Sequence, residues 1–253
     1  MEFITQKEID FFHANGYLVL EGVIEPERCD YFLNLFIEHA EKIGNHDFKE
    51  MLQIHRELPE VLELMKDKKA VAAIEGILDG EAVGLQTVCT FKKAGTPSAK
   101  HAWNPHQDGT YMNVEHNKEE YNDGSEVEDK EVSGYVSGNV VLDDHLPSSG
   151  VLYVYPGSHV EELLPYERKT SFNKGGLEEN PGNKVLNVPQ KYKKANLYPK
   201  KGSFIVFHGN LIHGSYENTS KNLSRPVLLQ SYTKKGVEFY AGQTAKRIPI
   251  SLK

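Results

Sequence analysis

Residues 101–109 read HAWNPHQDG and place His106 and Asp108 one residue apart. In a β-strand, residues i and i+2 project to the same face, so an imidazole and a carboxylate at this spacing can point at one site. These donors suit a divalent ion such as Fe(II), provided that a third ligand completes one face of the ion and leaves positions open. Taken alone, the pair is equally compatible with two polar residues that share a strand.

His213 is the candidate for the third ligand. The chain has 11 histidines, and this one closes the apolar run GSFIVFHGNLIHGS in the strand-rich half of the sequence. His208 and His116 are rivals on spacing alone, and a hydrogen-bonded strand histidine with no metal is the alternative.

Ser215 and Arg225, which follow His213 in the chain, suggest a ligand that would bind beside the metal. Ser215 would share a strand face with His213, and Arg225 begins the strand RPVLLQSY. A guanidinium forms a bidentate pair with a carboxylate, and a neighbouring hydroxyl adds a hydrogen bond. Such a pair suits a dicarboxylic acid that chelates the metal through its other end, whereas a surface arginine is the alternative.

The elements that must position these side chains change in character along the chain. The first 80 residues are predicted to be mainly helical, with a capping box at TQKE (5–8), a short strand YLVL after Gly16, and the longest helix beginning at Pro26. From Val83 onward, short β-branched or aromatic runs alternate with Gly, Pro and Asn turns. This order predicts an α+β fold with a β-sandwich or barrel core. We expect one domain over 1–253, with the core at 83–240.

Two segments depart from the strand pattern. Residues 115–131 carry eight acids against two lysines and are predicted to be a solvated insertion. Residues 167–196 are polar, with Gly175, Gly176 and Gly182 as hinges, and are predicted to be a long loop that closes over the site as a lid. A surface excursion with no role is the alternative for this loop.

The composition excludes several classes of partner. A net charge of −7 disfavours nucleic-acid binding, and the chain has no apolar run long enough for a membrane span. No signal peptide is recognisable, and two widely separated cysteines, Cys29 and Cys89, suit reduced thiols, so we expect a cytoplasmic protein. Nothing in the sequence predicts an oligomeric state. The lysines at 191, 193, 194, 200 and 201 permit an anionic substrate, although such a cluster is more often a solvated loop than an anion site.

Three blocks of the sequence resemble the signature blocks of the phytanoyl-CoA dioxygenase family. They are HQDGTY, LDDHLPSSGVLYVYPGSH and HGSYENTSKNLSRPVLLQSY, and they run from residue 106 to residue 232. Members of this family are non-haem Fe(II)/2-oxoglutarate oxygenases with a double-stranded β-helix (jelly-roll, cupin-like) core. The chain departs from the family pattern at Pro105, where relatives place a tryptophan, and Trp103 stands two residues earlier.

The resemblance implies a role for individual residues. The implied iron ligands are His106, Asp108 and His213; the implied 2-oxoglutarate contacts are Arg225, Ser215, Asn139 and Lys92; and Gln86 is an implied substrate contact. We further expect Trp103 and Tyr111 to face the substrate.

The resemblance also implies the reaction, which is the hydroxylation of a small-molecule metabolite with 2-oxoglutarate and O2 as cosubstrates and succinate and CO2 as products. Halogenating relatives have a small residue where Asp108 stands, which favours hydroxylation here. Two other classes stay open: a β-helix protein that binds metal or 2-oxoglutarate without catalysis, and a zinc hydrolase that uses the same triad.

Overall fold

The computed structural model describes residues 3–48, 50–112, 134–164, 166–168, 184–242 and 244–253. Its α-helices are α1 (Gln6–Asn15), α2 (Pro26–Lys42), α3 (Leu62–Met65) and α4 (Lys68–Leu78). Its strands are β1 (Tyr17–Leu20), β2 (Met51–Leu52), β3 (Ala82–Lys92), β4 (Trp103–His106), β5 (Tyr135–Val141), β6 (Leu152–Val154), β7 (Tyr166–Arg168), β8 (Lys184–Leu186), β9 (Ala195–Asn196), β10 (Phe204–His208), β11 (His213–Ser215), β12 (Arg225–Lys234) and β13 (Ile250–Ser251).

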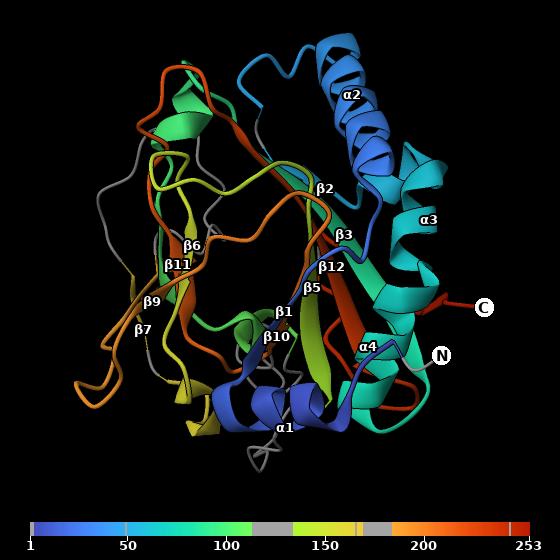
Figure 1. The fold of residues 1–253 in the computed structure, drawn as a ribbon, viewed down its shortest axis with the longest axis vertical. Coiled ribbons are helices and arrows are strands. Elements are labelled where there is room, and N and C mark those ends of the chain that lie inside the picture. The colour runs from blue at the N-terminus through green and yellow to red at the C-terminus, as the bar shows by residue number, and fades with distance from the viewer. Residues whose placement is uncertain (1–2, 49, 113–133, 165, 169–183, 243) are drawn as a thin grey trace.

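Two antiparallel sheets face each other, as a double-stranded β-helix requires. The larger sheet has the strand order β1-β10-β5-β12-β3-β13, with β2 also paired to β3, and the smaller has the order β4-β11-β6-β9. The helices α2, α3 and α4 cover the outer face of the larger sheet, while the smaller sheet lies across from its inner face (Figure 1). The predicted α+β class and β-helix core are confirmed.

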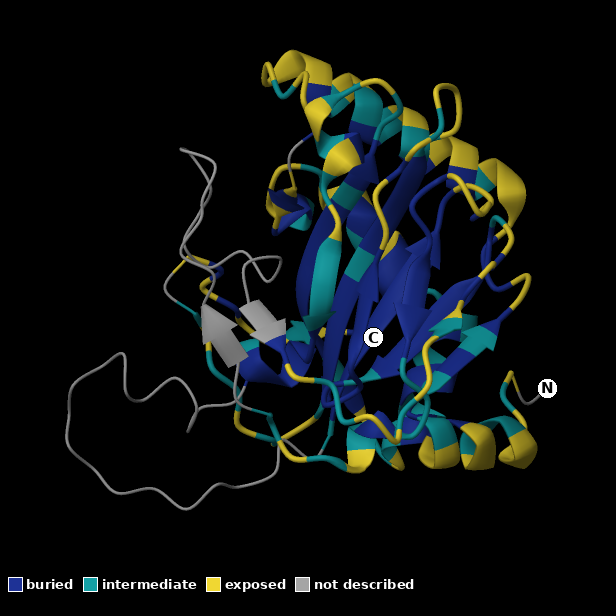
Figure 2. Cartoon of the chain, turned by 90° about the vertical axis from the view of Figure 1, so that its left-hand side faces the viewer, coloured by how far each residue is buried: buried dark blue, intermediate teal, exposed yellow. Residues whose placement is uncertain are grey.

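The alternation of side chains along the strands explains why both faces of the larger sheet are covered. In β10, Phe204 and Val206 belong to the core beneath the helices, whereas Ile205 and Phe207 belong to the core between the sheets. Apolar residues at successive positions bury both faces of a strand. The strands of the larger sheet are accordingly buried, and the helices expose only their outer faces (Figure 2).

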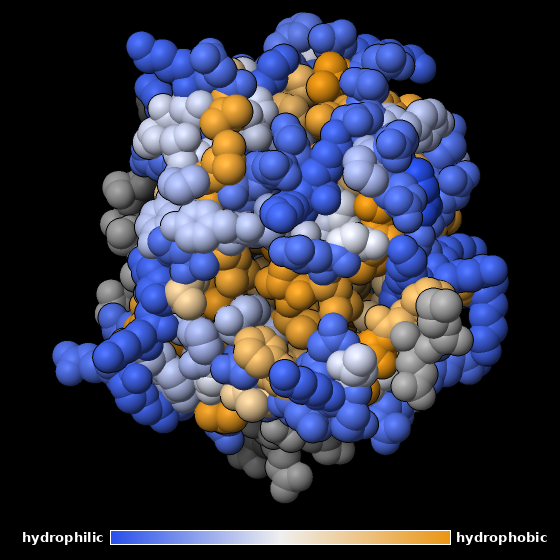
Figure 3. All heavy atoms as spheres, in the orientation of Figure 1, coloured by the Kyte–Doolittle hydropathy of each residue, from blue (hydrophilic) through white to orange (hydrophobic). Residues whose placement is uncertain are grey.

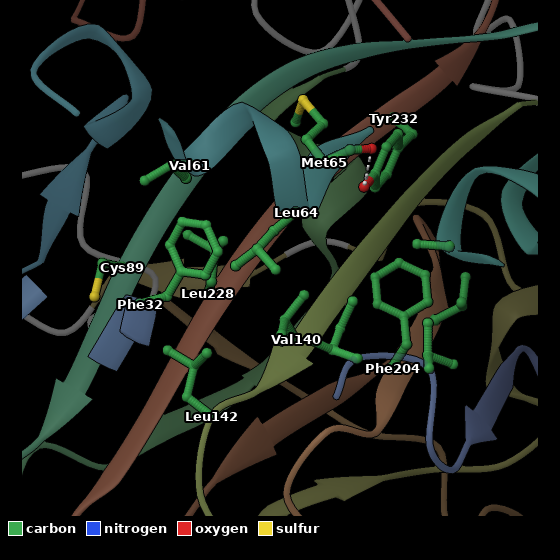
Figure 4. Close-up of a cluster of buried hydrophobic side chains, with 14 of the residues drawn as sticks. Phe32, Val61, Leu64, Met65, Cys89, Val140, Leu142, Phe204, Leu228 and Tyr232 are labelled. Atoms are coloured by element: carbon green, nitrogen blue, oxygen red, sulfur yellow. Dashed lines mark hydrogen bonds between the residues drawn. The ribbon is translucent and has the colours of Figure 1, made fainter. Parts of the chain in front are cut away.

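The core beneath the helices joins the N-terminal half of the chain to the sheet. Phe32 of α2 and Leu64 of α3 pack with Val140 and Leu228 of the sheet (Figure 4). The hydroxyl of Tyr232 donates to the Oε1 of Gln230 at 2.8 Å and lies 3.3 Å from the carbonyl oxygen of Met65. The helical half therefore serves as the outer support of the sheet that carries Arg225.

The predicted helix starts are confirmed. Thr5 caps α1 and exchanges hydrogen bonds with Glu8 in a capping box, and α1 ends before Gly16, whose φ is 78°. A left-handed residue at this position favours glycine. Pro26 is the first residue of α2, the longest helix among the described residues.

The boundaries of the β core are wider than predicted. The larger sheet recruits β1 and β2 from the helical half and β13 from beyond residue 240. Residues 167–196 are also not a continuous loop, since they include the end of β7 and all of β8 and β9. The acidic insertion at 115–131 and the hinge glycines of the expected lid lie outside the described residues.

Apolar side chains gather near the centre of one face of the molecule, over β1 and between the two sheets (Figure 3). A groove beside β1 is lined by Phe11, Tyr17, Leu18, Val19, Glu21, Asn196, Leu197, Tyr198 and Pro199. None of these residues lines the cavity that holds the metal ligands described below. Among the described residues, no helix is long and apolar enough to cross a membrane.

Candidate metal and cosubstrate site

A cavity of about 210 Å³ opens between the two sheets. Strands β3, β5 and β12 form one wall, and β4, β6 and β11 form the other. Nine of the residues singled out in the sequence line this cavity: Gln86, Trp103, His106, Asp108, Tyr111, Asn139, His213, Ser215 and Arg225. The tertiary structure thus brings together side chains that are up to 139 positions apart in the chain (225 − 86).

Strand pairing places the two histidines opposite each other. In the β4–β11 ladder His106 is the direct partner of His213, and their ring centroids are 4.4 Å apart. Oδ1 of Asp108 lies 3.5 Å from Nε2 of His106 and 3.8 Å from Nε2 of His213. One ligand atom from each residue lies within 4.8 Å of the others, as binding of a single ion requires.

His106 and Asp108 converge, but not because they share one face of a strand, as the sequence predicted. Strand β4 ends at His106, and Asp108 begins a 3-10 turn over Asp108–Tyr111. Gln107 between them turns away and anchors the loop through hydrogen bonds to the carbonyl oxygens of Asn210 and Glu162 and from the amide of Leu164. Asp108 therefore reaches the metal position from a turn and not from the same strand face.

Both histidines present the correct nitrogen to a metal. Nδ1 of His106 lies 2.7 Å from the carbonyl oxygen of Asn104, and Nδ1 of His213 lies 3.0 Å from that of Leu211. A carbonyl can only accept, so each Nδ1 carries the proton and each Nε2 keeps its lone pair. Burial also lowers the pKa of His213 to about 4, which keeps its ring neutral at pH 7.

Asp108 is held as a carboxylate. Burial alone would raise its pKa, but the adjacent imidazoles of His213 and His106 and the hydrogen bond from Ser137 hold the pKa below its usual range. The hydroxyl of Ser137 donates to Oδ2 of Asp108 over 2.6 Å. The Ser137 oxygen in turn lies 3.0 Å from the hydroxyl of Tyr135.

Arg225 is a buried cation that lines the cavity. It is 2% exposed, its Nε has no hydrogen-bond partner, and it forms no ion pair with a carboxylate among the described residues. Burial lowers its pKa to about 10, so the guanidinium stays charged at neutral pH. A buried charge is costly unless it is paired, which indicates that an anion completes the site.

Asn139 and Ser215 add polar groups beside Arg225. Nδ2 of Asn139 is buried without a partner among the described residues. Ser215 accepts a hydrogen bond from Nζ of Lys92 at 2.8 Å, and its own hydroxyl hydrogen stays available to the cavity. Lys92 does not itself line the cavity, but this hydrogen bond connects it to Ser215, which does.

The rival third ligand His208 does not join this site. His208 accepts a hydrogen bond on Nδ1 from the amide of Asn210, and its ring stacks edge-on against His159 at 5.3 Å. Among the described residues, it belongs to no group of side chains that could hold a metal. His116 lies outside the described residues.

Several residues of the site were not recognised from the sequence. Ser137 and Tyr135 precede Asn139 at intervals of two in β5, and this strand periodicity could have identified them. Arg247 and Glu50 line the cavity from segments outside the three sequence blocks. Nε of Arg247 donates to Oε1 of Gln86 at 2.5 Å, and no local pattern indicates that pairing.

The sequence matches the family model "Phytanoyl-CoA dioxygenase (PhyH)" over residues 12–227. This chain belongs to the phytanoyl-CoA dioxygenase family. The match includes the triad, Ser215 and Arg225, whereas Arg247 lies beyond its end.

Curated relatives agree over most of the chain. Phytanoyl-CoA dioxygenase domain-containing protein 1 of Danio rerio is 24% identical over 277 aligned positions, which cover 87% of each chain. Phytanoyl-CoA dioxygenase of Arabidopsis thaliana is 25% identical over 266 positions, which cover 86% of this chain and 84% of the relative.

Solved structures share the fold of this family member. The non-haem α-ketoglutarate-dependent carbocyclase SnoK from nogalamycin biosynthesis superposes with a TM-score of 0.69 at 14% identity, covering 98% of this chain and 92% of SnoK. EctD from S. alaskensis with bound Fe gives a TM-score of 0.68 at 18% identity, covering 94% of this chain and 79% of EctD.

The residues of the site fit the metal and cosubstrate of the family. Two imidazole nitrogens and one carboxylate oxygen on one side of a position form the donor set of non-haem Fe(II) oxygenases. Arg225 adds an unpaired buried cation to the same cavity, which suits a cosubstrate that carries a carboxylate. This phytanoyl-CoA dioxygenase family member is therefore a non-haem iron oxygenase that uses 2-oxoglutarate.

Proposed function

We propose that this chain hydroxylates a small-molecule metabolite, with His106, Asp108 and His213 as the iron ligands and with release of succinate and CO2. The observation that carries the proposal is that the triad and the uncompensated Arg225 share one cavity. A dicarboxylate can chelate a metal held by the triad while its other end pairs with Arg225 and Ser215. A site built only for a structural metal would not need a second buried cation.

Bound iron supplies the oxidising chemistry, and the residues of this chain decide where it acts. The triad occupies one side of the metal and leaves the side that faces the cavity for cosubstrate, O2 and substrate. Arg225, Ser215 and Asn139 orient the cosubstrate. The apolar side chains of Val227, Leu229 and Phe207 in the same walls exclude water from the reacting atoms.

Gln86, Trp103 and Tyr111 are proposed to contact the substrate. All three line the cavity, and Trp103 lies near His106 with ring centroids 5.9 Å apart. A volume of about 210 Å³ suits a small metabolite or the reactive end of a longer one. Glu50 and Arg247, which also line the cavity, add one acid and one base to its wall.

The lysine cluster does not support the expectation of an anionic substrate. None of its five lysines lines the cavity. Lys191 pairs with Glu161, Lys201 pairs with Asp30, and Lys194 lies over the ring of Tyr153 at 4.1 Å. An anionic substrate would have to be recognised by Arg247 instead.

The decisive experiment measures CO2 released from 2-oxoglutarate labelled at C1. The protein is supplied with Fe(II) and screened against pools of small metabolites, with oxygen-18 gas used to trace O2 into the product. Labelled CO2 that rises with one metabolite, together with an oxygen-18 hydroxyl in that metabolite, is the expected result.

The matched controls are Arg225→Ala and His213→Ala, which should both lose CO2 release. Tight 2-oxoglutarate binding without CO2 release in any pool would favour a non-catalytic binding protein. Hydrolysis that needs zinc and is unaffected by Arg225→Ala would favour a zinc hydrolase.

A further inference from the structure

Lys92 is a buried amine that stands behind the cosubstrate subsite. It is the direct strand partner of Arg225 in the β3–β12 ladder, so both side chains project from the same face of the sheet. Lys92 is 3% exposed and Arg225 is 2% exposed. Two basic side chains thus lie side by side, out of contact with water.

The hydrogen bonds of Lys92 match those of a neutral amine. Nζ donates to Oγ of Ser215 at 2.8 Å and to the carbonyl oxygen of Tyr216 at 2.5 Å. A neutral amine has two N–H groups, which these two acceptors satisfy, whereas an ammonium has three. A third acceptor for Nζ is not found among the described residues.

The surroundings of Lys92 also disfavour a positive charge on its amine. Burial lowers its pKa to about 5, the charge of Arg225 acts in the same direction, and Glu217 and Glu50 act against it. His145, from the loop after β5, lies near Arg225 and Lys92, and burial together with the charge of Arg225 holds its pKa well below the usual value. Lys92 forms no ion pair with any described carboxylate.

We propose that Lys92 serves the cosubstrate through Ser215 as a neutral amine, and that it takes up a proton when the carboxylate of 2-oxoglutarate reaches Arg225. This inference rests on the proposed function. While Lys92 occupies the oxygen of Ser215, the hydroxyl hydrogen of Ser215 is directed to the incoming carboxylate. The carboxylate then pairs with Arg225 and accepts the hydrogen bond of Ser215, whose oxygen contacts Nζ of Lys92. Its negative charge favours protonation of the Lys92 amine. Lys92 is therefore a positioning residue, and its protonation follows cosubstrate binding.

The expected linkage can be given a size. An opposite charge within about 4–6 Å shifts a pKa by roughly 1–3 units. A shift of this size from about 5 means that the binding of one 2-oxoglutarate at pH 6 should be accompanied by uptake of roughly 0.4–0.9 proton.

The test is calorimetric titration of the full chain, loaded with manganese(II), with 2-oxoglutarate at pH 6. Manganese(II) keeps its bound waters protonated at this pH, so displaced water takes up no proton. Repeating the titration in buffers of different ionisation enthalpy yields the number of protons bound. We expect uptake in the wild type and its loss in Lys92→Met, which keeps a side chain of similar length, together with a 10-fold or greater loss of 2-oxoglutarate affinity.

Two matched variants separate Lys92 from the other titrating groups near the site. Glu50, whose pKa burial raises to about 7, is already mostly protonated at pH 6, and Glu50→Gln should keep the uptake. His145→Gln should keep it as well. If Lys92 had only a structural role, Lys92→Met would bind 2-oxoglutarate more weakly, but the wild type would take up no proton on binding.

A second readout uses the wild type and does not depend on folding of a variant. In the magnesium-loaded protein, a lysine Cε resonance should titrate near pH 5 without 2-oxoglutarate and at a higher pH with it. Binding of 2-oxoglutarate with no proton uptake, or uptake that persists in Lys92→Met, would overturn the inference while leaving the proposed function intact. Failure of 2-oxoglutarate to bind at all would instead reject the proposed function.

Discussion

Ser137 donates its hydroxyl to Oδ2 of Asp108, and this contact leaves Oδ1 of the same carboxylate facing His106 and His213. Ser137 lies in β5 of the larger sheet, whereas Asp108 lies in the 3-10 turn that follows β4 of the smaller sheet. The larger sheet thus orients a ligand that the smaller sheet supplies.

Ser137→Ala should weaken metal binding while the fold is kept. Without the hydroxyl, the Asp108 carboxylate loses the partner that fixes its orientation, and losses of such partners cost about 10–100-fold in metal affinity. Metal affinity is measured by competition with a chelating dye. Ser231→Ala is the matched control, because Ser231 contacts Tyr135 and not Asp108. Equal effects of both variants would argue against this role.

Alanine at His106, Asp108 or His213 should abolish iron binding and turnover. Each of these three residues provides one of the donor atoms, and removing one leaves two. Iron content after dialysis and the circular dichroism spectrum together distinguish lost ligation from lost folding. His208→Gln should retain iron, and retention of iron by His213→Ala would show that the third ligand is assigned incorrectly.

Arg225→Ala should raise the requirement for 2-oxoglutarate steeply. Loss of one member of a buried charged pair costs about 2–5 kcal/mol, because the other charge is left unpaired. Arg225→Lys should restore only part of the affinity, since an ammonium lacks the planar fork of a guanidinium. Kd for 2-oxoglutarate on the manganese(II) protein is the measurement, and an unchanged Kd in Arg225→Ala would remove this residue from the site.

Gly214→Ala should weaken metal binding, because Gly214 lies between His213 and Ser215 in β11. An added Cβ would lie 2.6 Å from the backbone oxygen of Trp103 and against the hydroxyl of Tyr153. Because Trp103 belongs to β4, the clash would push β4 away from β11 and His106 away from His213. We expect a loss of metal affinity comparable to that of a ligand variant. Normal metal binding in Gly214→Ala would show that the two strands can yield.

The metal-free protein should lose stability on acidification from pH 7 to pH 5. Burial lowers the pKa of His208 to about 4 and holds that of His145 well below its usual value of 6.5. In this window the unfolded chain binds more protons, so the free energy of unfolding falls as the pH falls, by roughly 1–2 kcal/mol for His208. Glu50, whose pKa is raised to about 7, acts in the opposite direction and reduces the net change.

Urea unfolding at pH 7 and pH 5 measures this difference. His208→Gln should reduce the pH dependence, because glutamine does not titrate. If the free energy of unfolding of His208→Gln changes between pH 7 and pH 5 as much as that of the wild type, His208 does not contribute.

Local chemistry made much of this protein predictable from its sequence. The capping box at Thr5, the proline that begins α2 and the strand runs after Val83 depend on neighbouring residues, and they were confirmed. The three metal-site residues were identifiable because few residue types bind Fe(II) and because their spacing matches a family pattern. Arg225 was singled out because its spacing from His213 matches the same family pattern.

Contacts between distant segments could be decided only by the tertiary structure. Pairing of β4 with β11 sets His106 against His213, and the inner face of β5 brings Ser137 to Asp108, over separations that local propensity does not encode. The hydrogen bond from Lys92 to Ser215 depends on the register of β3 against β12 and on where β11 lies in the other sheet, which the sequence alone does not encode. Arg247 donates a hydrogen bond to Gln86, which lies 161 residues earlier in the chain. Buried polar side chains need such partners, but only the fold determines which residue provides one.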